Sequence, residues 1–598
     1  MSLSDARVAP LENEPSTMEN GEKNGDLSVS ITSLERRRQE DQKKSEADEE
    51  DPWALVAPPH KGKYWREMTC SEKLQDVGII FVRLILLFVL LYFFICSLNF
   101  LSDAFRLLGG KAAGKALSNN KILNNPISNL MMGILATVLL QSSSTTTSIV
   151  VTMVASSLLN VRQAIFIIMG ANIGTSVTNT IVSVGQAGKR NEFRRAFAGA
   201  TVHDMFNWLS VVCILPIEWL TGAFGSWKDC GLLCQLTHAM TKNLNSEKHS
   251  TKKELLKALT KPFTRLIIQL DKKIITKYAQ NDNTTNSNLT LVKHVCKITV
   301  PQAVYVGNNT CRIEHVESMG RCHFLFENLA RTWSDHALGV LLLVLALGIL
   351  CLCLVLIVKL LHSLLRGKIA TVLRRFINAD FPGRFRHLTG YVAILIGAGF
   401  TMLVQSSSVF TSALTPLVGV GILHLDRMYP LTLGANIGTT FTAILAALAS
   451  NRDVFQKTLQ VALSHLFFNI FGILIWYPVP VMRNVPINLA KMLGNTTAKY
   501  RWFAFVYLFV VFLVIPGMVF GLSVAGTAVL AGVGLPIFFF FVAIAVINVL
   551  QKKKPNVLPA KLKNWEFLPR PLHSLQPYDD VFTRLCSVCK CCISDSDD

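Results

Sequence analysis

The chain has few charged residues for its length. Of its 598 residues, 16% are Asp, Glu, Lys or Arg, whereas a soluble globular domain has about 25%. With 51% hydrophobic residues and a mean hydropathy of +0.39, this scarcity excludes an ordinary soluble protein. Apolar runs such as 77–101 and 337–361 are long enough to cross a bilayer as helices. The sequence therefore predicts an all-α polytopic membrane protein.

Several functional signatures are absent from the sequence. There is no GxxxxGK[ST] phosphate-binding loop, no soluble segment large enough for ATP chemistry and no metal-ligand cluster in the predicted spans, which argues against a pump or a membrane enzyme. No series of charged rings is apparent, so an anion channel is a less favoured alternative to a carrier. The first apolar segment begins near Val77 after a charged leader, and we expect no cleaved signal peptide.

The formal net charge of +20 is concentrated in loops. Basic residues gather in 189–195, 366–387 and 551–563, which flank apolar segments. The positive-inside rule makes these loops cytoplasmic, while lipid headgroups or nucleic acid are the alternative partners for such charge. We expect a lipid bilayer around the chain and no nucleic-acid partner.

The pattern divides the chain into five parts. Residues 1–76 form a cytoplasmic tail, 77–222 a first membrane half, 223–335 an extracellular loop, 336–550 a second membrane half and 551–598 a cysteine-rich cytoplasmic tail. Three glycosylation sequons, at Asn283, Asn288 and Asn308, place the loop outside the cell. An oxidising compartment lets cysteines of this loop pair, and the disulfide candidates are Cys296, Cys311 and Cys322, with connectivity left open.

The two membrane halves are internal repeats. QSSS occurs at 141–144 and 405–408, and GANIGT at 170–175 and 434–439, both at an offset of 264 residues. If 223–335 is outside and 366–387 inside, the repeats have opposite orientations, as in many secondary transporters. We predict about eight full spans and two re-entrant QSSS hairpins. His203 and His465 also hold matching positions, but we do not count them as ligands.

Each QSSS motif lies in the middle of an apolar segment of hairpin length. A helix broken at membrane depth survives only when it is buried in protein or lines a wet cavity. The break exposes backbone N–H groups and the positive end of a helix dipole, and serine hydroxyls add further donors. Two such tips predict a binding site for a small anion. The alternative is that these hydroxyls bond back to the preceding helical turn.

The GANIGT motifs predict the complementary chemistry. Gly, Asn and Gly in an apolar segment would unwind each helix and present carbonyls beside Asn172 or Asn436, which suits sodium. The alternative is that the glycines permit close helix packing. Asp204 lies in another apolar segment, where a carboxylate binds a cation, relays a proton or pairs structurally with a neighbour such as His203.

The duplicated QSSS and GANIGT motifs, together with RRAFAGATVHDMFNWLS at 194–210, resemble the type II sodium-dependent phosphate cotransporters over about residues 75–550. The resemblance implies sodium-coupled uptake of inorganic phosphate, mainly divalent, by alternating access. It implies no enzyme activity and no cofactor, with Na⁺ as the co-transported ion. It also implies a homodimer of independent protomers in the apical plasma membrane of epithelial cells, with cytoplasmic termini and a disulfide in the glycosylated loop.

The resemblance also assigns roles to residues. The phosphate ligands are then Gln141, Ser142, Ser143, Ser144, Thr175, Gln405, Ser406, Ser407 and Ser408. Gln186, Asn207, Thr439 and Thr442 match the family's sodium ligands, and the residue chemistry given above adds Asp204, Asn172 and Asn436 to the predicted sodium-binding set. Two positions depart from the family pattern, because Lys189 stands where relatives have Asp and Ala435 where they have Ser.

Two finer features follow from the resemblance. Ala198, Ala200 and Asp204 match the electrogenic branch, in which the added carboxylate supports one more sodium and so couples transport to voltage at about 2.3 kcal/mol per charge per 100 mV. The cysteine-rich tail resembles the type IIb branch. Its palmitoylation candidates are Cys586, Cys589, Cys591 and Cys592, with a zinc site as the alternative. The residues alone fit a sodium-coupled carrier of sulfate or a carboxylate nearly as well as one of phosphate.

Overall fold

The computed structural model describes residues 69–117, 125–156, 158–224, 230–242, 262–279, 290–306, 310–364, 378–448 and 452–559, together with Trp53, 562–569, 574–579 and Val581. The sequons at Asn283, Asn288 and Asn308 lie outside the described residues. So do the palmitoylation candidates Cys586, Cys589, Cys591 and Cys592.

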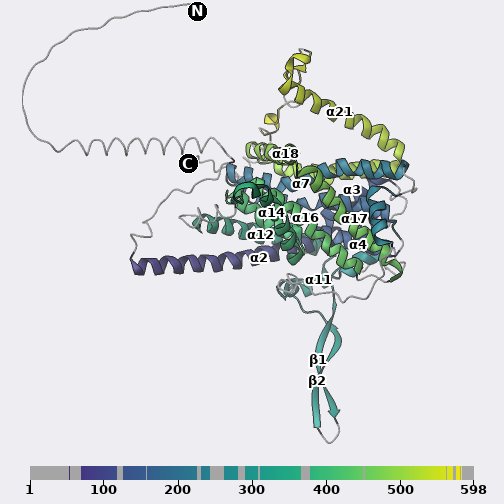
Figure 1. Cartoon of the computed structure of the whole chain (residues 1–598). Coiled ribbons are helices and arrows are strands. Elements are labelled where there is room, and N and C mark those ends of the chain that lie inside the picture. The colour runs from purple at the N-terminus through teal and green to yellow at the C-terminus, as the bar shows by residue number, and fades with distance from the viewer. Residues whose placement is uncertain are drawn as a thin grey trace, which may run out of the picture. The chain divides into compact units, whose positions relative to one another are not determined.

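Long apolar helices dominate the fold (Figure 1). Nine helical segments within the described residues are long and apolar enough to cross a membrane. They are built from α2 (Cys70–Leu117), α5 and α6 (Val161–Gly174, Ser176–Val184), α7 (Arg190–Phe224), α12 (Asp335–Leu364), α14 (Leu388–Val404), α16 (Leu425–Leu448), α17 (Arg452–Trp476), α19, η2 and α20 (Phe503–Phe509, Val510–Val514, Ile515–Ala525) and α21 (Thr527–Lys553). The prediction of an all-α membrane protein is confirmed; the re-entrant hairpins and the inverted orientation stay predictions.

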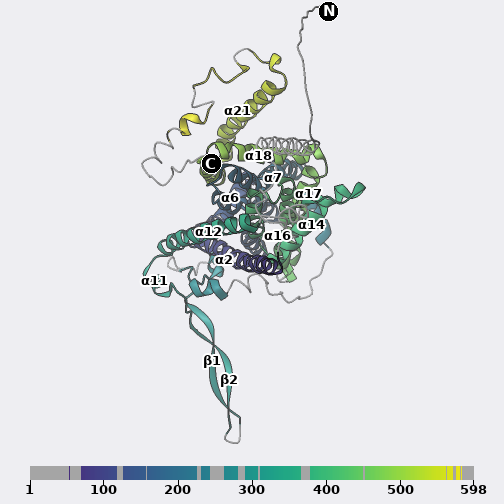
Figure 2. The ribbon, with the colours of Figure 1, turned by 90° about the vertical axis from the view of Figure 1, so that its left-hand side faces the viewer.

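Shorter helices complete the bundle. They are α3 (Pro126–Leu140), α4 (Ser143–Ala155), α8 (Leu232–Thr241), α10 (Lys272–Ala279), α11 (Glu327–Thr332), α15 (Ser407–Gly419) and α18 (Pro480–Lys499), with short 3₁₀ turns at Gly383–His387 and Pro555–Val557. Helix α12 packs along α2, as both Figure 1 and Figure 2 show. Further contacts join α3 to α5 and α14 to α16, so each repeat packs its QSSS hairpin on its GANIGT helix.

The predicted extracellular loop contains one β-hairpin that the sequence analysis did not anticipate. Strands β1 (Val295–Val306) and β2 (Thr310–Arg321) pair antiparallel, with Val295 opposite Arg321 (Figure 1). A disulfide between Cys296 and Cys322 closes the base of this hairpin. This bond confirms two of the three disulfide candidates, while Cys311 lies on β2 opposite Tyr305.

A second disulfide joins Cys230 and Cys234, at the start of α8. The sequence analysis did not include these two cysteines among its disulfide candidates. Their spacing of four residues matches one helical turn, so the pair closes locally and does not bridge distant segments.

The glycines of GANIGT hold helices in close contact. A Cβ at Gly170 would lie 2.0 Å from the carbonyl oxygen of Leu130, and a Cβ at Gly434 would lie 2.0 Å from that of Ile394. Leu130 and Ile394 are themselves 264 residues apart, so the sequence offset is preserved in the packing. Small residues at such contacts let helix backbones approach closely.

The predicted unwinding at GANIGT is therefore wrong. Helix α16 runs unbroken through Gly434–Thr439. In the first repeat only Thr175 separates α5 from α6, and its backbone remains helical at φ −64° and ψ −30°. The glycines allow close contact between neighbouring helices, and such contact requires no break in the helix.

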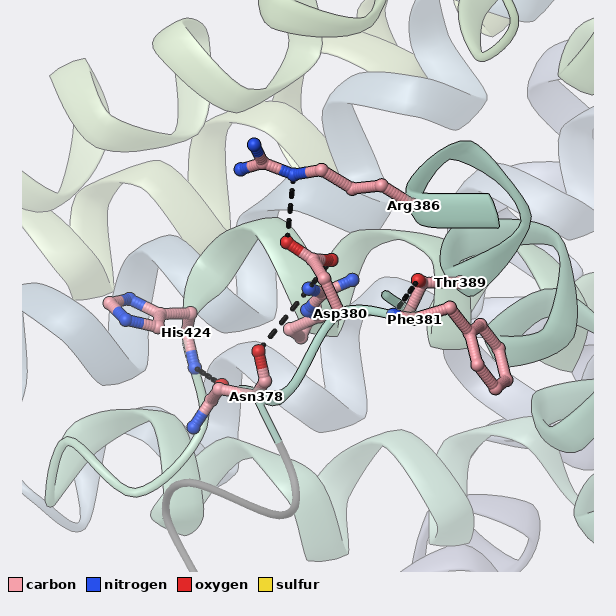
Figure 3. Close-up of polar contacts among 7 residues, drawn as sticks. Asn378, Asp380, Phe381, Arg386, Thr389 and His424 are labelled. Carbon is pink, nitrogen blue, oxygen red and sulfur yellow. Dashed lines mark hydrogen bonds and ion pairs between the residues drawn. The ribbon is translucent and has the colours of Figure 1, made fainter. Parts of the chain in front are cut away.

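A polar cluster ties the segment before α14 to the start of α16 (Figure 3). Asn378 accepts a hydrogen bond from the His424 backbone N–H at 3.0 Å and donates to the Ile422 carbonyl at 2.7 Å. Asp380 pairs with Arg427 and, at 3.0 Å, with Arg386. These contacts fix the turn between α15 and α16, and with it the end of the second QSSS hairpin.

Replacing Gly434 with Ala should destabilise the protein strongly. The added methyl meets the α14 backbone, which cannot yield as a flexible side chain would, so we expect a loss of about 1–3 kcal/mol or more. Thermal unfolding of the purified protein in detergent measures the change. Gly399→Ala on α14 is the control, since a Cβ there meets nothing within 4 Å; equal losses in both variants would contradict the packing role.

Neutralising Asp380 should weaken the α14–α16 connection in a pH-dependent way. The hydrogen bond from Arg427, with the charges of Arg427 and Arg386, keeps the pKa of Asp380 below its ordinary value of 3.8, against the opposing effect of burial. Its stabilisation is therefore complete above the ordinary carboxyl pKa and is lost as pH falls through the lowered value. Since the pair is partly exposed, we expect at most about 1 kcal/mol. Wild type and Asp380→Asn should differ in unfolding midpoint at neutral pH and converge in acid.

Candidate functional site

Both QSSS motifs break a helix in the same way. Gln141, after α3, and Gln405, after α14, adopt left-handed backbone with φ of 50° and 54°. Within the described residues they are the only non-glycine residues with positive φ. Such a conformation costs roughly 1–3 kcal/mol and persists where the surrounding structure enforces it. The shared conformation indicates that these two positions belong to one candidate functional site.

A new helix begins directly after each glutamine. Ser142 caps α4, its hydroxyl oxygen accepting from the Thr145 backbone N–H at 3.2 Å. Ser406 caps α15, accepting from the Val409 backbone N–H at 3.3 Å. Both helices have 13 residues, and their N-terminal ends carry the free N–H groups and positive dipole end that favour an anion.

The two breaks open onto one cavity of about 300 Å³. Since a water takes about 30 Å³ in the liquid, this space suffices for a small anion with several waters. Five pairs of residues related by the 264-residue offset line it: Gln141 and Gln405, Ser142 and Ser406, Ser144 and Ser408, Thr145 and Val409, and Thr178 and Thr442. The duplication in the sequence thus becomes a pseudo-symmetric cavity in the structure.

Six of the nine predicted phosphate ligands line this cavity. The other three are buried but do not line it: Ser143, Ser407 and Thr175. The middle serine of the QSSS motif is thus absent from the cavity lining in both repeats. Thr175 instead bonds back to the Ala171 carbonyl at 3.0 Å, the alternative expected for a helical threonine.

Helix α2 completes the cavity wall with Leu98, Asn99, Ser102 and Arg106, and α10 adds Thr276. Among the described residues that line the cavity, Arg106 alone carries a charge. The site therefore combines two helix N-termini, neutral hydroxyl and amide groups and one guanidinium. Every one of these charges or dipoles favours an anion.

A chain of buried hydrogen bonds joins the two repeats beside the cavity helices. His203 contacts Asn436 Oδ1 through Nε2 at 2.6 Å, and His465 contacts Asn172 Oδ1 through Nε2 at 3.1 Å. Since His203 matches His465 and Asn172 matches Asn436, each repeat places its histidine on the asparagine of the other. These crossed contacts hold the two GANIGT helices, α5 and α16, against α17 and α7.

The pseudo-symmetry of this chain is broken at two links, because Asn469, the match of Asn207, donates to the His465 carbonyl at 3.0 Å and not to Asn436. Asn436 Nδ2 donates to Asn207 Oδ1 at 2.8 Å, and Asn207 donates in turn to the Asn172 carbonyl at 2.8 Å. The matching pair, Asn172 Nδ2 and Asn469 Oδ1, is fully buried and has no hydrogen-bond partner. An unpaired buried polar group costs about 1–3 kcal/mol, so the two halves of the core are energetically unequal.

Comparison with known proteins identifies the family. The Na⁺/Pi-cotransporter family model matches residues 93–214 and 349–493. Sodium-dependent phosphate transport protein 2B of Pongo abelii is 51% identical over 570 residues, covering 91% of this chain and 80% of that protein. Protein 2B of Homo sapiens is 50% identical with the same coverage, and protein 2A of Rattus norvegicus is 50% identical over 523 residues, covering 87% and 80%. No solved structure matches the chain.

The chain belongs to the type II sodium-dependent phosphate cotransporter family. The resemblance found in the motifs is thereby confirmed. Both segments matched by the family model contain a QSSS and a GANIGT motif, so the repeats that form the cavity lie within the family-matched part of the chain.

The predicted sodium ligands do not form one cluster. Asn172, Asn207 and Asn436 meet in the buried chain described above, and Thr442 faces the cavity. The remaining three lie elsewhere. Gln186 is buried against Gly419 with both amide atoms unpaired, Thr439 bonds back to Ala435, and Asp204 pairs with Tyr507. Lys189, at the position that departs from the family, forms an ion pair with Glu192 at 3.0 Å.

The residues matched to the electrogenic branch all lie on α7 and are fully buried: Ala198, Ala200 and Asp204. One oxygen of Asp204 accepts from the Tyr507 hydroxyl, and the other has no partner. Tyr507 is on α19, directly before the π-helical segment η2, and such segments often occur at functional sites. Asp204 does not pair with His203, whose Nε2 contacts Asn436.

Sequence reasoning missed four residues of this site: Arg106, Thr178, Asn179 and Tyr507. Thr178 had a usable signal, because it matches Thr442 in the repeat. Asn179 accepts from both Thr411 and Ser412 of α15, at 2.8 and 2.9 Å, yet its repeat counterpart is Ala443. Arg106 and Tyr507 lie outside the duplicated motifs, where no repeat could indicate them.

Replacing Asn436 with Ala should destabilise the core between the repeats. The change leaves His203 Nε2 and Asn207 Oδ1 unpaired at full burial, for an expected loss of about 2 kcal/mol or more. Thermal unfolding in detergent measures it, with Thr440→Ala as the control. Thr440 bonds only within its own helix, to Ile437, so its loss should stay within about 1 kcal/mol. Similar losses in the two variants would show that the crossed contacts do not stabilise the protein.

Proposed function

We propose that the chain carries inorganic phosphate, mainly as the dianion, into the cell together with sodium. The observation that carries the proposal is the single cavity lined by both QSSS motifs in matching pairs. Its donors are hydroxyls, amides, two helix N-termini and one guanidinium, a set that suits a compact oxyanion. The relatives are named sodium-dependent phosphate transport proteins, which supports phosphate among the oxyanions that fit.

Transport proceeds by alternating access between the two repeats. Their crossed histidine–asparagine contacts and shared cavity support a site at the interface of two similar units, which is where many secondary transporters bind their substrate. The unequal hydrogen bonding of the two halves supports two interconverting arrangements. In the second arrangement Asn172 and Asn469 would form a side-chain hydrogen bond, and Asn436 and Asn207 would lose theirs.

The transport cycle is electrogenic, with Asp204 serving an additional sodium ion. Its unpaired carboxylate oxygen, fully buried on α7, supports a cation ligand, because neutral partners alone leave a buried carboxylate poorly compensated. The other inferred sodium ligands would act at separate places along the path: Gln186, Asn207, Thr439, Thr442, Asn172 and Asn436.

The protein would act in the apical plasma membrane of epithelial cells, as a homodimer of independent protomers with cytoplasmic termini. The five-part organisation from the sequence fits this arrangement. The glycosylated segment 223–335 is then extracellular, and its Cys296–Cys322 disulfide supports an oxidising compartment. The chain would have no enzyme activity and no resident cofactor.

Voltage clamp and radiolabelled uptake in oocytes test this function. Wild type should show an inward current and phosphate uptake, both lost when sodium is withdrawn. Asp204→Gly should keep the uptake and lose the current, because the additional sodium site is removed. Phosphate uptake without current in the wild type would be consistent with cotransport but would reject an electrogenic cycle. No phosphate uptake despite surface expression would reject phosphate, and sulfate would be tested next.

A further inference from the structure

Arg106 lies within a predicted membrane span and faces the protein interior. It belongs to the apolar segment Val77–Ala113 of α2, is 5% exposed and lines the cavity shared by both QSSS motifs. A charged residue inside a span is costly, and where it occurs it usually marks a substrate or ion path. No duplicated motif contains it, and the ligand set inferred from the family does not include it.

The contacts of the guanidinium leave one edge available. Nη1 pairs with Asp103 Oδ1 at 2.8 Å, one helical turn away on α2. Nη2 donates to the Thr145 hydroxyl at 3.2 Å, a long bond, and Nε is shielded from solvent without any partner. Nε and Nη2 form the side-on edge with which arginine makes two parallel hydrogen bonds to a phosphate or carboxylate.

Through Nη2 the guanidinium contacts a residue of the predicted anion site. Thr145, which Nη2 contacts, is in the first turn of α4 and lines the cavity beside Ser142 and Ser144. Its hydroxyl also donates to Ser142 Oγ at 2.9 Å. The guanidinium, Thr145 and the helix cap thus form one connected group of polar atoms. An anion at the N-terminus of α4 would replace the weak Thr145 contact with a charge-assisted pair.

The charge balance of the cavity favours such a role. Each helix N-terminus is equivalent to about half a positive charge, so α4 and α15 together supply roughly one. A phosphate dianion carries two negative charges before sodium is counted, and Arg106, although paired with Asp103, is the one charged residue that the described cavity lining offers as a direct donor. Without it, the neutral hydroxyls and amides would hold a monoanion nearly as well as a dianion.

We propose that Arg106 is a ligand of the transported anion, binding it through Nε and Nη2, while Asp103 positions the guanidinium through Nη1. The inference rests on the proposed function and extends it, because it names the residue that favours divalent over monovalent phosphate. A purely structural arginine joining α2 to α4 would leave phosphate affinity unchanged.

Three variants test the proposal by sodium-dependent uptake of radiolabelled phosphate, with surface expression measured in parallel. Arg106→Gln removes the charge and the fork, Arg106→Lys keeps the charge alone, and Lys111→Gln is the matched control. Lys111 is on the same helix and loses both a positive charge and an ion pair, with Asp335 at 2.7 Å, but does not line the cavity. The KM for phosphate is determined at pH values below and above the second pKa of phosphate. The dependence of uptake on sodium concentration is measured at saturating phosphate.

The Gln variant should raise the phosphate KM at least tenfold and lose most of its preference for the dianion. The Lys variant should raise the KM less and keep that preference, and sodium activation at saturating phosphate should stay near wild type in both. Lys111→Gln should leave the KM within about twofold, since exposed or distant charges contribute little. This pattern would establish Arg106 as a ligand.

Other outcomes would overturn the proposal. A normal phosphate KM with reduced maximal uptake in Arg106→Gln would make the arginine structural, and an equal KM rise in Lys111→Gln would reduce the effect to general electrostatics. If the Gln variant fails to reach the surface, Arg106→Lys decides, because it also lacks the fork. An unchanged phosphate KM in Arg106→Lys, with the wild-type dependence on phosphate ionisation, would reject bidentate binding. Absence of uptake in the wild type itself rejects phosphate as the cargo, and so ends the proposed function and this inference together.

Discussion

The structure depends on what happens to backbone polar groups when a helix is interrupted in an apolar environment. Each QSSS motif ends one helix and starts another within three residues, which frees carbonyls on one side and N–H groups on the other. In lipid these groups would be prohibitively costly, so they must be buried in protein or face a wet cavity. The left-handed Gln141 and Gln405 and the serine caps satisfy part of this demand. The remaining N–H groups at the helix starts create the cavity's preference for an anion.

The rest of the bundle supports these two interruptions. Close glycine contacts hold α3 on α5 and α14 on α16, so each broken segment rests on a continuous neighbour. The polar cluster around Asp380 fixes the far end of the second hairpin, and Asn179 of the first repeat accepts two hydrogen bonds from the second. The backbone strain at the glutamines can persist because several independent contacts enforce the same geometry.

Residues that are duplicated form most of the cavity lining, whereas the proposed selectivity rests on residues that depart from the symmetry. Matched serines, glutamines and threonines give neutral donors on both sides, which any small oxyanion could use. Within the described residues, the Asp204–Tyr507 pair and the unpaired Asn172 and Asn469 have no equivalent in the other repeat, and Arg106 lies outside the duplicated motifs. The proposed charge selection, sodium coupling and two-state behaviour all rest on residues at which the repeats differ.

Local sequence pattern determined the helical membrane fold, the repeat and the QSSS cavity, because hydropathy and a fixed offset of 264 residues are properties of the chain itself. It could not decide between unwinding and close packing at GANIGT, since glycine permits both and only the neighbouring Leu130 and Ile394 backbones select one. Nor could it indicate Arg106, Tyr507 or the crossed histidine–asparagine contacts, because each depends on side chains brought together from distant segments. A periodic pattern shows which residues share a face of a helix, whereas tertiary packing decides which faces contact each other. The charged residues of this site come together only through that packing.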